Sequence, residues 1–181
     1  LFILVLAFIQ RMRRRVMPHA DFAPPVTVVV PAFSEGKVIV NTVTSLLAQA
    51  YGGSLNVVVV DDGSPDDTFA VASAAFAGHP QVAVHTKPNG GKASALTFGI
   101  ARASADIVVC LDADTQFEPQ TVAELVAPLA DPKVGAVAGN AKVGNRVNLV
   151  TRWQALEYVT SQNLDRRAFA LLDCITVIPG A

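Results

Sequence analysis

Short runs rich in valine and isoleucine recur along the chain, and longer stretches with a helical pattern separate them. The runs are mostly apolar without regular alternation, which is typical of strands that are covered on both faces of a sheet. We expect strands at residues 26–30, 55–60, 82–85, 107–111 and 134–138. We expect helices between them at residues 37–49, 66–76, 92–103 and 119–129, with Pro119 at the first helical position of the last. This alternation predicts an α/β fold, Rossmann-like, with a mostly parallel sheet and helices on both faces.

An uncharged apolar run at residues 1–9 opens the chain, and four arginines follow it within residues 11–15. A helix needs about 20 residues to cross a bilayer core, so we expect this run to be the end of a longer transmembrane helix. The arginines would then lie on the cytoplasmic side. A signal peptide is the alternative, but its basic residues precede the apolar stretch. We therefore predict a membrane-helix end with a basic flank at residues 1–16 and a proline-rich linker at residues 17–25.

Charge and cysteine content narrow the classes of partner. Lys and Arg total 14 and Asp and Glu total 15, which leaves a formal net charge of -1. Nucleic-acid binding requires clustered positive charge across a face, so we expect no nucleic acid among the partners. Cys110 and Cys174 both lie in apolar sequence without a Cys-x-x-Cys pair, which argues against zinc and disulfides and favours buried, unpaired thiols.

The last stretch of the chain differs in pattern from the units before it. Apolar residues recur near helical spacing between about residues 149 and 172, which predicts one long amphipathic helix. Packing against the sheet and lying on a membrane surface are both compatible with this pattern. A short strand is expected after it, at residues 175–178.

Polar residues gather where the expected strands end, which is where open parallel sheets bind their ligands. The fourth strand runs into Asp112-Ala113-Asp114, whose two carboxylates can address one ligand. Hard oxygen donors suit Mg²⁺ or Mn²⁺, ions that keep positions open for phosphate oxygens and neutralise charge on a departing diphosphate. A lone Asp-x-Asp also caps helices or ends strands, so the prediction depends on its place after an apolar strand.

The second strand runs into Asp61 and Asp62, which precede a Gly-Ser-Pro-Asp turn. We expect Asp61 to accept hydrogen bonds from amides of this turn. A carboxylate at Asp62 can accept the imide N–H of a uracil, a contact that distinguishes uridine from cytidine by the proton pattern of the base.

A third polar segment, Gly90-Gly91-Lys92, combines a flexible turn, a helix amino terminus and a cation. This combination favours an anionic phosphate group. It is not a P-loop, because Ala93 follows the lysine and no glycine stands five residues before Gly91. The glycine spacing of dinucleotide-binding folds is absent as well, which argues against a nicotinamide enzyme.

In this order, the segments resemble family 2 glycosyltransferases of the GT-A fold, in particular the membrane-bound bacterial synthases of the poly-N-acetylglucosamine, chitin and hyaluronan type. The resemblance spans about residues 26–146. It rests on four motifs: Val-Val-Val-Pro-Ala-Phe-Ser-Glu-Gly, Val-Asp-Asp-Gly-Ser, Gly-Gly-Lys-Ala-Ser-Ala-Leu and Leu-Asp-Ala-Asp.

For the nucleotide, the resemblance implies that Pro31, Ala32 and Glu35 border the nucleoside. It implies that Asp62 reads the base and that Lys92 lies near the base and the diphosphate.

For the metal and the sugar, the resemblance implies that Asp114 is the principal ligand of a Mg²⁺ or Mn²⁺ ion and that Asp112 serves the ribose or the metal. Gly139 and Asn140 would help to form the floor under the donor sugar. The reaction would invert the anomeric carbon, because a base-activated acceptor hydroxyl attacks opposite the leaving diphosphate.

The whole enzyme is then expected to transfer a sugar, N-acetylglucosamine or a similar one, from a UDP-sugar to a growing polysaccharide. A polysaccharide or lipid-linked acceptor and the lipid of the bacterial inner membrane would be its further partners, with the catalytic domain facing the cytosol. Transfer of a single sugar to a lipid phosphate and a non-catalytic nucleotide-binding scaffold are the alternatives.

Two motifs of these synthases are missing from the chain: the acidic motif with the catalytic base, and Gln-x-x-Arg-Trp. Arg152-Trp153 does not supply the second motif, because Leu149 stands where the glutamine belongs. We expect residues 26–181 to be the donor-binding part of a catalytic domain, truncated on its C-terminal side. The general base would lie beyond Ala181, and this piece alone would be inactive.

Overall fold

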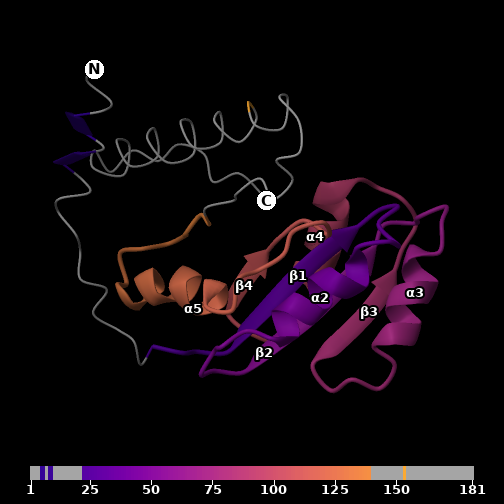
Figure 1. The fold of residues 1–181 in the computed structure, drawn as a ribbon, viewed down its shortest axis with the longest axis horizontal. Coiled ribbons are helices and arrows are strands. Elements are labelled where there is room, and N and C mark those ends of the chain that lie inside the picture. Colours follow the sequence, from indigo (N-terminus) through magenta and orange to yellow (C-terminus); the bar gives the residue numbers. More distant parts are fainter. Residues whose placement is uncertain (1–4, 7, 10–21, 140–152, 154–181) are drawn as a thin grey trace. The chain divides into compact units, whose positions relative to one another are not determined.

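A computed structural model describes residues 5–6, 8–9, 22–139 and 153 of the chain. The chain divides into two compact units, one of residues 19–132 with 180–181 and the other of residues 1–18 with 133–179. The sheet and its helices belong to the first unit (Figure 1). Asn140, Cys174, the expected strand at 175–178 and, apart from Trp153, the expected helix at 149–172 lie outside the described residues.

Four parallel strands form the sheet, in the spatial order β3-β2-β1-β4. Their bounds are Val26–Ala32 for β1, Leu55–Asp61 for β2, Val82–Thr86 for β3 and Ile107–Cys110 for β4. The central strands β1 and β2 are almost entirely buried, as their continuous apolar sequence predicts. The prediction of a parallel sheet is therefore confirmed.

The register of the sheet aligns the carboxyl ends of the strands. Ala32 pairs with Asp61, and Asp61 in turn pairs with Thr86. Cys110 ends β4 opposite Val29, three residues before the end of β1. The residues after Cys110 consequently lie beside the C-terminal part of β1. There, the Leu111 N–H donates to the Val29 carbonyl over 3.3 Å.

Helices cover both faces of this sheet (Figure 1). Helices α2 (Ile39–Leu47), α3 (Thr68–Ala75) and α5 (Thr121–Val126) pack on the face that receives Val28, Val30 and Val57. Helix α4 (Lys92–Ile100) packs on the opposite face, against Val29 and Val60. The alternation of core residues along β1 follows from the strand period of two.

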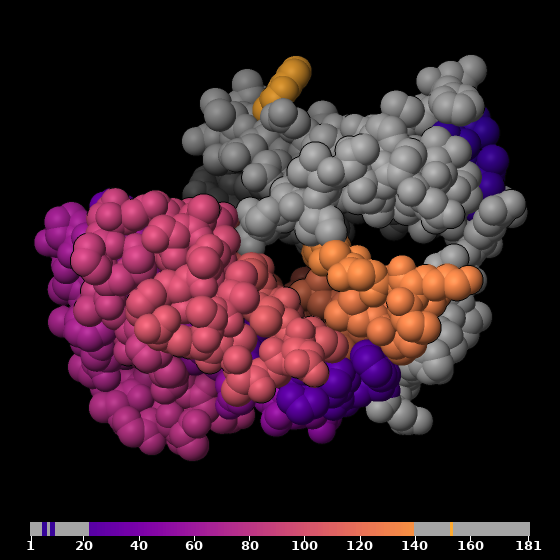
Figure 2. Space-filling view, turned by 180° about the vertical axis from the view of Figure 1, so that it is seen from behind, coloured from indigo at the N-terminus to yellow at the C-terminus, as the bar shows by residue number. Residues whose placement is uncertain are grey.

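The approach of α4 to the sheet depends on Gly99. A Cβ atom at this position would lie 2.4 Å from Cγ1 of Val29 and 3.2 Å from Cγ2 of Val60. The space-filling view from behind looks onto this face, where the pink atoms of α4 and its flanking turns lie across the middle (Figure 2). The absence of a side chain at Gly99 therefore brings the helix, and with it Lys92 at its first turn, close to the strands.

Two expectations from the sequence are wrong in detail. Residues 134–138 form no strand, because they pair with no neighbour in the described part of the chain and are only partly buried. The expected helix at 119–129 begins later, at Thr121, and its end is the 3-10 helix η1 (Ala127–Ala130). Pro128 explains the change at the end of the helix, since proline lacks the N–H of an α-helical hydrogen bond and clashes with the preceding turn.

Cys110 is a free thiol, as expected, but it is only partly buried. It belongs to β4, which has one neighbouring strand in the described sheet and is half-buried along its length. None of the described helices is long and apolar enough to cross a membrane.

We predict that Gly99→Ala lowers the free energy of unfolding by about 1–3 kcal/mol, the usual cost of overpacking. Alanine has the higher helix propensity, by about 1 kcal/mol, so a loss despite that gain isolates the steric clash. Urea unfolding measures the change. Gly135→Ala is the control, because its Cβ would meet no atom within 4 Å; equal stability of the two variants would contradict the prediction.

Candidate functional site

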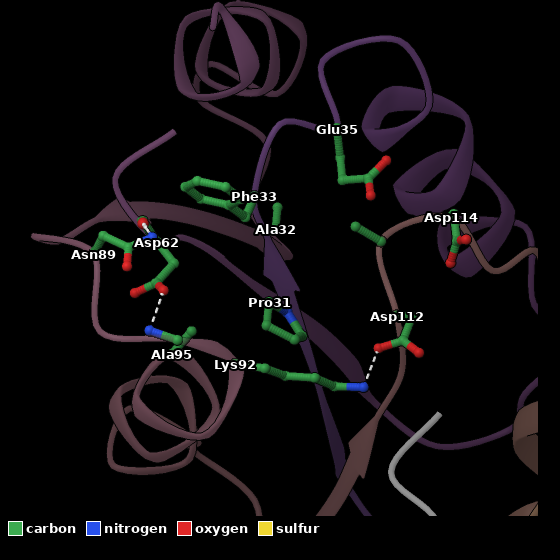
Figure 3. A pocket seen from close by; sticks show the side chains of 12 residues that line it. Pro31, Ala32, Phe33, Glu35, Asp62, Asn89, Lys92, Ala95, Asp112 and Asp114 are labelled. Carbon is green, nitrogen blue, oxygen red and sulfur yellow. Dashed lines mark hydrogen bonds and ion pairs between the residues drawn. The ribbon is translucent and has the colours of Figure 1, made fainter. Parts of the chain in front are cut away.

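A pocket of about 350 Å³ opens at the carboxyl ends of β1, β2 and β4 (Figure 3). It lies beside the amino terminus of α4, so strand ends and a helix start converge on it. Its lining residues are Pro31, Ala32, Phe33, Glu35, Asp62, Asn89, Gly91, Lys92, Ala95, Asp112, Ala113 and Asp114. Acidic side chains and one lysine thus face a common space.

The acidic turn after β4 carries Asp112 and Asp114 on either side of the buried Ala113. The Thr115 N–H donates to the Asp112 carbonyl over 3.0 Å and closes the turn. From α2, the Thr42 hydroxyl donates to the Ala113 carbonyl over 2.6 Å. Both aspartates line the pocket, with Asp114 on the side of Glu35 and Asp112 on the side of Lys92 (Figure 3).

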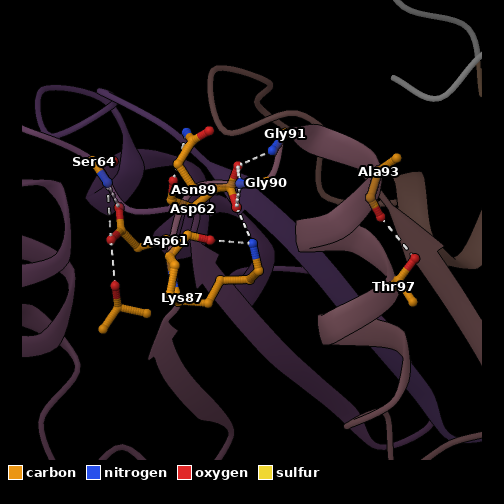
Figure 4. Close-up of polar contacts among 11 residues, drawn as sticks. Asp61, Asp62, Ser64, Lys87, Asn89, Gly90, Gly91, Ala93 and Thr97 are labelled. Carbon is orange, nitrogen blue, oxygen red and sulfur yellow. Dashed lines mark hydrogen bonds and ion pairs between the residues drawn. The ribbon is translucent and has the colours of Figure 1, made fainter.

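The two aspartates at the end of β2 have separate surroundings (Figure 4). Asp61 accepts hydrogen bonds from the Thr86 hydroxyl over 2.8 Å and from the Ser64 N–H over 3.3 Å. It therefore holds the turn and the neighbouring strand, as expected, and it does not line the pocket.

Asp62 does line the pocket, but its side chain is only 4% exposed. Its carboxylate accepts hydrogen bonds from the Lys87 ammonium at 2.5 Å, from the Gly91 N–H at 2.6 Å and from the Gly90 N–H at 3.1 Å. The backbone carbonyl of Asp62 also accepts a hydrogen bond, from the Asn89 side-chain amide over 3.0 Å. Asp62 thus fixes the loop that leads into α4.

These contacts change the acidity of Asp62. Burial alone would raise the pKa of its carboxyl, but the hydrogen bonds from Lys87, Gly90 and Gly91 outweigh it and lower the pKa below the ordinary value of 3.8. The carboxylate is therefore charged at neutral pH. It can accept about four hydrogen bonds, and the three donors already occupy most of these positions.

Lys92 is the first residue of α4, after Gly91 with its positive φ of 83°. Its side chain extends across the pocket below Pro31 and forms an ion pair with Asp112 (Figure 3). The lysine and aspartate side chains are 46% and 40% exposed, so an incoming anion or cation can reach both. The start of the helix also favours anions through its dipole.

Glu35 reaches the pocket from the turn that follows β1. Ser34 takes up the positive φ of 59° in this turn, and the Glu35 N–H donates to the Thr68 hydroxyl over 2.9 Å. Burial, followed by the negative charges of Asp114, Asp66 and Asp112, raises the pKa of the Glu35 carboxyl. The pocket therefore has a negative potential on this side, which a cation would relieve.

The donor set fits a hard divalent cation that is completed by phosphate. Within the described residues, no group of three or more His, Cys, Asp or Glu comes together to hold a metal by itself. Mg²⁺ is commonly bound by one or two carboxylates together with substrate phosphates, and Asp112 and Asp114 provide that number.

Seven residues singled out from the sequence meet at this pocket: Pro31, Ala32, Glu35, Asp62, Lys92, Asp112 and Asp114. Gly139 belongs to the other compact unit, and Asn140 lies outside the described residues. Sequence reasoning missed Phe33, whose ring is 49% exposed at the pocket, and Lys87, the partner of Asp62. Phe33 directly follows the first strand, and this position could have indicated that it lines a site at the strand ends. The pairing of Lys87 with Asp62 follows from the sheet register.

Comparisons with known proteins agree with this geometry. Residues 27–178 match the family described as Glycosyl transferase family 2. The poly-beta-1,6-N-acetyl-D-glucosamine synthase of Staphylococcus aureus (strain COL) is 30% identical over 163 residues, which are 90% of this chain and 39% of that protein. The synthase of the same name from Staphylococcus epidermidis is 29% identical over 156 residues, with 86% of this chain and 38% of that protein covered.

Solved structures share the fold. A mannosyltransferase from Pyrobaculum calidifontis, in complex with GDP-Man and Mn²⁺, has a TM-score of 0.67 and 31% identity, over 78% of this chain and 43% of that one. Staphylococcus aureus TarS 1-349, in complex with UDP-GlcNAc, has a TM-score of 0.52 and 24% identity, over 59% of this chain and 31% of that one. The second likeness concerns the fold alone.

The parallel sheet with its pocket at the strand ends is thus a GT-A fold, the fold of these glycosyltransferase neighbours. The chain belongs to glycosyltransferase family 2. It spans 39% of the length of the Staphylococcus aureus synthase that it matches.

We predict that Asp62 makes the stability of the chain depend on pH in the acid range. A carboxyl with a lowered pKa stabilises the fold above its unfolded pKa, and the contribution is lost as the pH falls through the folded pKa. Thermal unfolding between about pH 6 and pH 3 measures the effect, and Asp62→Asn should flatten the fall below the ordinary pKa of 3.8. The exposed Glu124→Gln is the control; an unchanged pH profile in Asp62→Asn would contradict the prediction.

Proposed function

We propose that this chain is the donor-binding part of an inverting, metal-dependent glycosyltransferase that takes a sugar from a nucleoside diphosphate. The observation that carries the proposal is the convergence of Lys92, Asp112 and Asp114 on one pocket at the ends of β1, β2 and β4. A cationic helix start beside two carboxylates suits a diphosphate with a divalent ion, because each charge has a partner of opposite sign. Membership of family 2 supports the same function.

Asp112 and Asp114 would hold the Mg²⁺ or Mn²⁺ ion, which supplies neutralisation of charge on the leaving diphosphate when it is bound. Lys92 then exchanges its ion pair with Asp112 for contact with the diphosphate. This exchange gives Lys92 a partner of opposite charge whether the donor is bound or not. The Mn²⁺ in the mannosyltransferase complex supports a divalent ion here.

Phe33 and Asp62 provide the base site in this proposal, with Pro31, Ala32 and Glu35 bordering the nucleoside. The exposed Phe33 ring offers an apolar face on which a base can stack. Asp62 has capacity for about one further hydrogen bond beyond those from Lys87, Gly90 and Gly91, and an imide N–H can use it.

A carboxylate at this place does not separate uracil from guanine, because both present a ring N–H next to a carbonyl. Cytosine presents an unprotonated ring nitrogen instead, which repels a carboxylate. We propose UDP-N-acetylglucosamine or a similar UDP-sugar as donor, because the synthases of both staphylococci are named for that sugar polymer. A GDP-sugar is the second candidate, since the mannosyltransferase with 31% identity is in complex with GDP-Man.

For the whole protein, we propose transfer to a growing polysaccharide or a lipid-linked acceptor at the bacterial inner membrane, facing the cytosol. Residues 1–16 would be the end of a transmembrane helix with a basic juxtamembrane segment, residues 17–25 a linker and residues 26–181 the donor-binding part of the catalytic domain, with Gly139 and Asn140 under the donor sugar. The apolar run followed by arginines supports this arrangement. Fractionation of cells that express the full-length protein tests it.

We predict that Mn²⁺ strengthens UDP binding to this chain and that Asp114→Ala removes this gain, by about tenfold or more, because a principal ligand is lost. Calorimetric titration of UDP with and without Mn²⁺ measures it. Asp106→Ala is the matched control, since this exposed aspartate precedes β4 at the opposite edge of the sheet. If UDP affinity changes neither with Mn²⁺ nor in Asp114→Ala, the assignment of the metal site is wrong.

We also predict that the chain binds CDP at least about tenfold more weakly than UDP, because the ring N3 of cytosine has no proton to donate to Asp62 and its lone pair repels the carboxylate. In Asp62→Asn the ratio of UDP to CDP affinity should fall towards one, since an amide offers both a donor and an acceptor. The ratio is insensitive to any loss of affinity that affects both nucleotides equally because the substitution disturbs the loop before α4. GDP in the same titration ranks the two donor candidates, and equal binding of UDP, GDP and CDP by the unaltered chain would remove the role of Asp62.

A further inference from the structure

Thr42 in α2 makes a contact that its position in a helix does not require. Its hydroxyl donates to the carbonyl of Ala113, which is 71 residues away in sequence, over 2.6 Å. Thr44 and Thr97, in helix interiors, instead donate to the carbonyls four residues before them in their own helices, Val40 and Ala93. That local bond is the usual one for a helical threonine.

The carbonyl that accepts this bond belongs to Ala113, the residue between Asp112 and Asp114. Thr42 is 1% exposed and Ala113 is 4% exposed, so the bond is buried. A hydrogen bond in such a buried place fixes the plane of the 113–114 peptide, and with it the direction in which Asp114 leaves the chain. A second bond, from the Thr115 N–H to the Asp112 carbonyl, closes the turn from the other side.

Two further side chains from the same side of α2 hold the segment beyond the turn. Ser45 accepts from the Phe117 N–H over 3.3 Å. Gln49, just past the helix end, accepts from the Val122 N–H over 3.0 Å and donates to the Glu118 carbonyl over 2.9 Å. The segment from Phe117 to Val122 therefore stays attached to α2 without Thr42, and only the aspartate turn depends on the Thr42 hydroxyl.

We infer that Thr42 is a positioning residue for the cation site: its hydroxyl sets the geometry of Asp112 and Asp114 through the Ala113 carbonyl. The inference rests on the proposed function, because it assigns a metal to these two aspartates. Outer-shell hydrogen bonds of this kind commonly change metal affinity by about 10–100-fold when they are removed.

The test compares UDP affinity with and without Mn²⁺ in the 181-residue chain and three variants. Thr42→Val keeps the shape and removes the donor, and it should reduce the Mn²⁺-dependent gain by about tenfold with UDP affinity in the absence of metal changed by less than about twofold. Thr42→Ser keeps a hydroxyl and should restore the gain. Ser45→Ala removes a neighbouring bond of the same interface and should leave the gain unchanged.

The outcomes separate the inference from the proposed function. Three results overturn the role of Thr42 while the metal assignment stands. The Mn²⁺-dependent gain in UDP affinity is normal in Thr42→Val, or Ser45→Ala loses as much of it. Alternatively, Thr42→Val loses as much UDP affinity without metal as it loses of the gain. No Mn²⁺ effect in the unaltered chain overturns both. Thermal unfolding of each variant identifies loss of folding, and if Thr42→Val does not fold, failure of Thr42→Ser to support the full gain overturns the inference.

Discussion

The parallel pairing of β1 with both β2 and β4 is the constraint on which the rest of the structure depends. Hydrogen bonds along both edges of β1 fix where each neighbour ends, and the three ends lie at one edge of the sheet. The segments that continue from these strands carry Glu35, Asp62 and Asp112. A shift of the register by one residue would turn each strand's side chains to the opposite face, so core burial and site geometry are specified together.

The site itself is built from loops whose positions are determined by partners in other elements. Asp62 holds the loop before α4 through backbone N–H groups, and this loop delivers Lys92 to the pocket. The turn with Asp114 is held from α2 through Thr42. Loops lack the regular hydrogen bonding of helices and strands, so buried backbone groups in them require such partners. Thr42 does not line the pocket, yet it shares in shaping it.

Two ion pairs balance part of the charge in the pocket. Lys87 pairs with Asp62 on one side and Lys92 pairs with Asp112 on the other, whereas Glu35 and Asp114 add negative charge next to each other. The largely buried pair has a structural role, because removal of either partner would leave the other charge without its partner and poorly solvated. The exposed pair costs little to separate, since solvent screens its charges. This difference suits Lys92 and Asp112 to exchange partners and Lys87 and Asp62 to remain together.

Much of this was accessible from the sequence. Continuous apolar runs predicted the buried parallel strands, because strand direction and strand ends are local properties of a chain. The polar residues at the strand ends indicated Asp62, Lys92, Asp112 and Asp114, and the family resemblance added Pro31, Ala32 and Glu35. The strand expected at residues 134–138 was wrong, since pairing requires a neighbour that a single segment cannot reveal. The partners Lys87 and Thr42 were also missed. Which donors meet Asp62 and the Ala113 carbonyl depends on register and on helix packing across 25 and 71 residues, and only the tertiary structure decides such contacts.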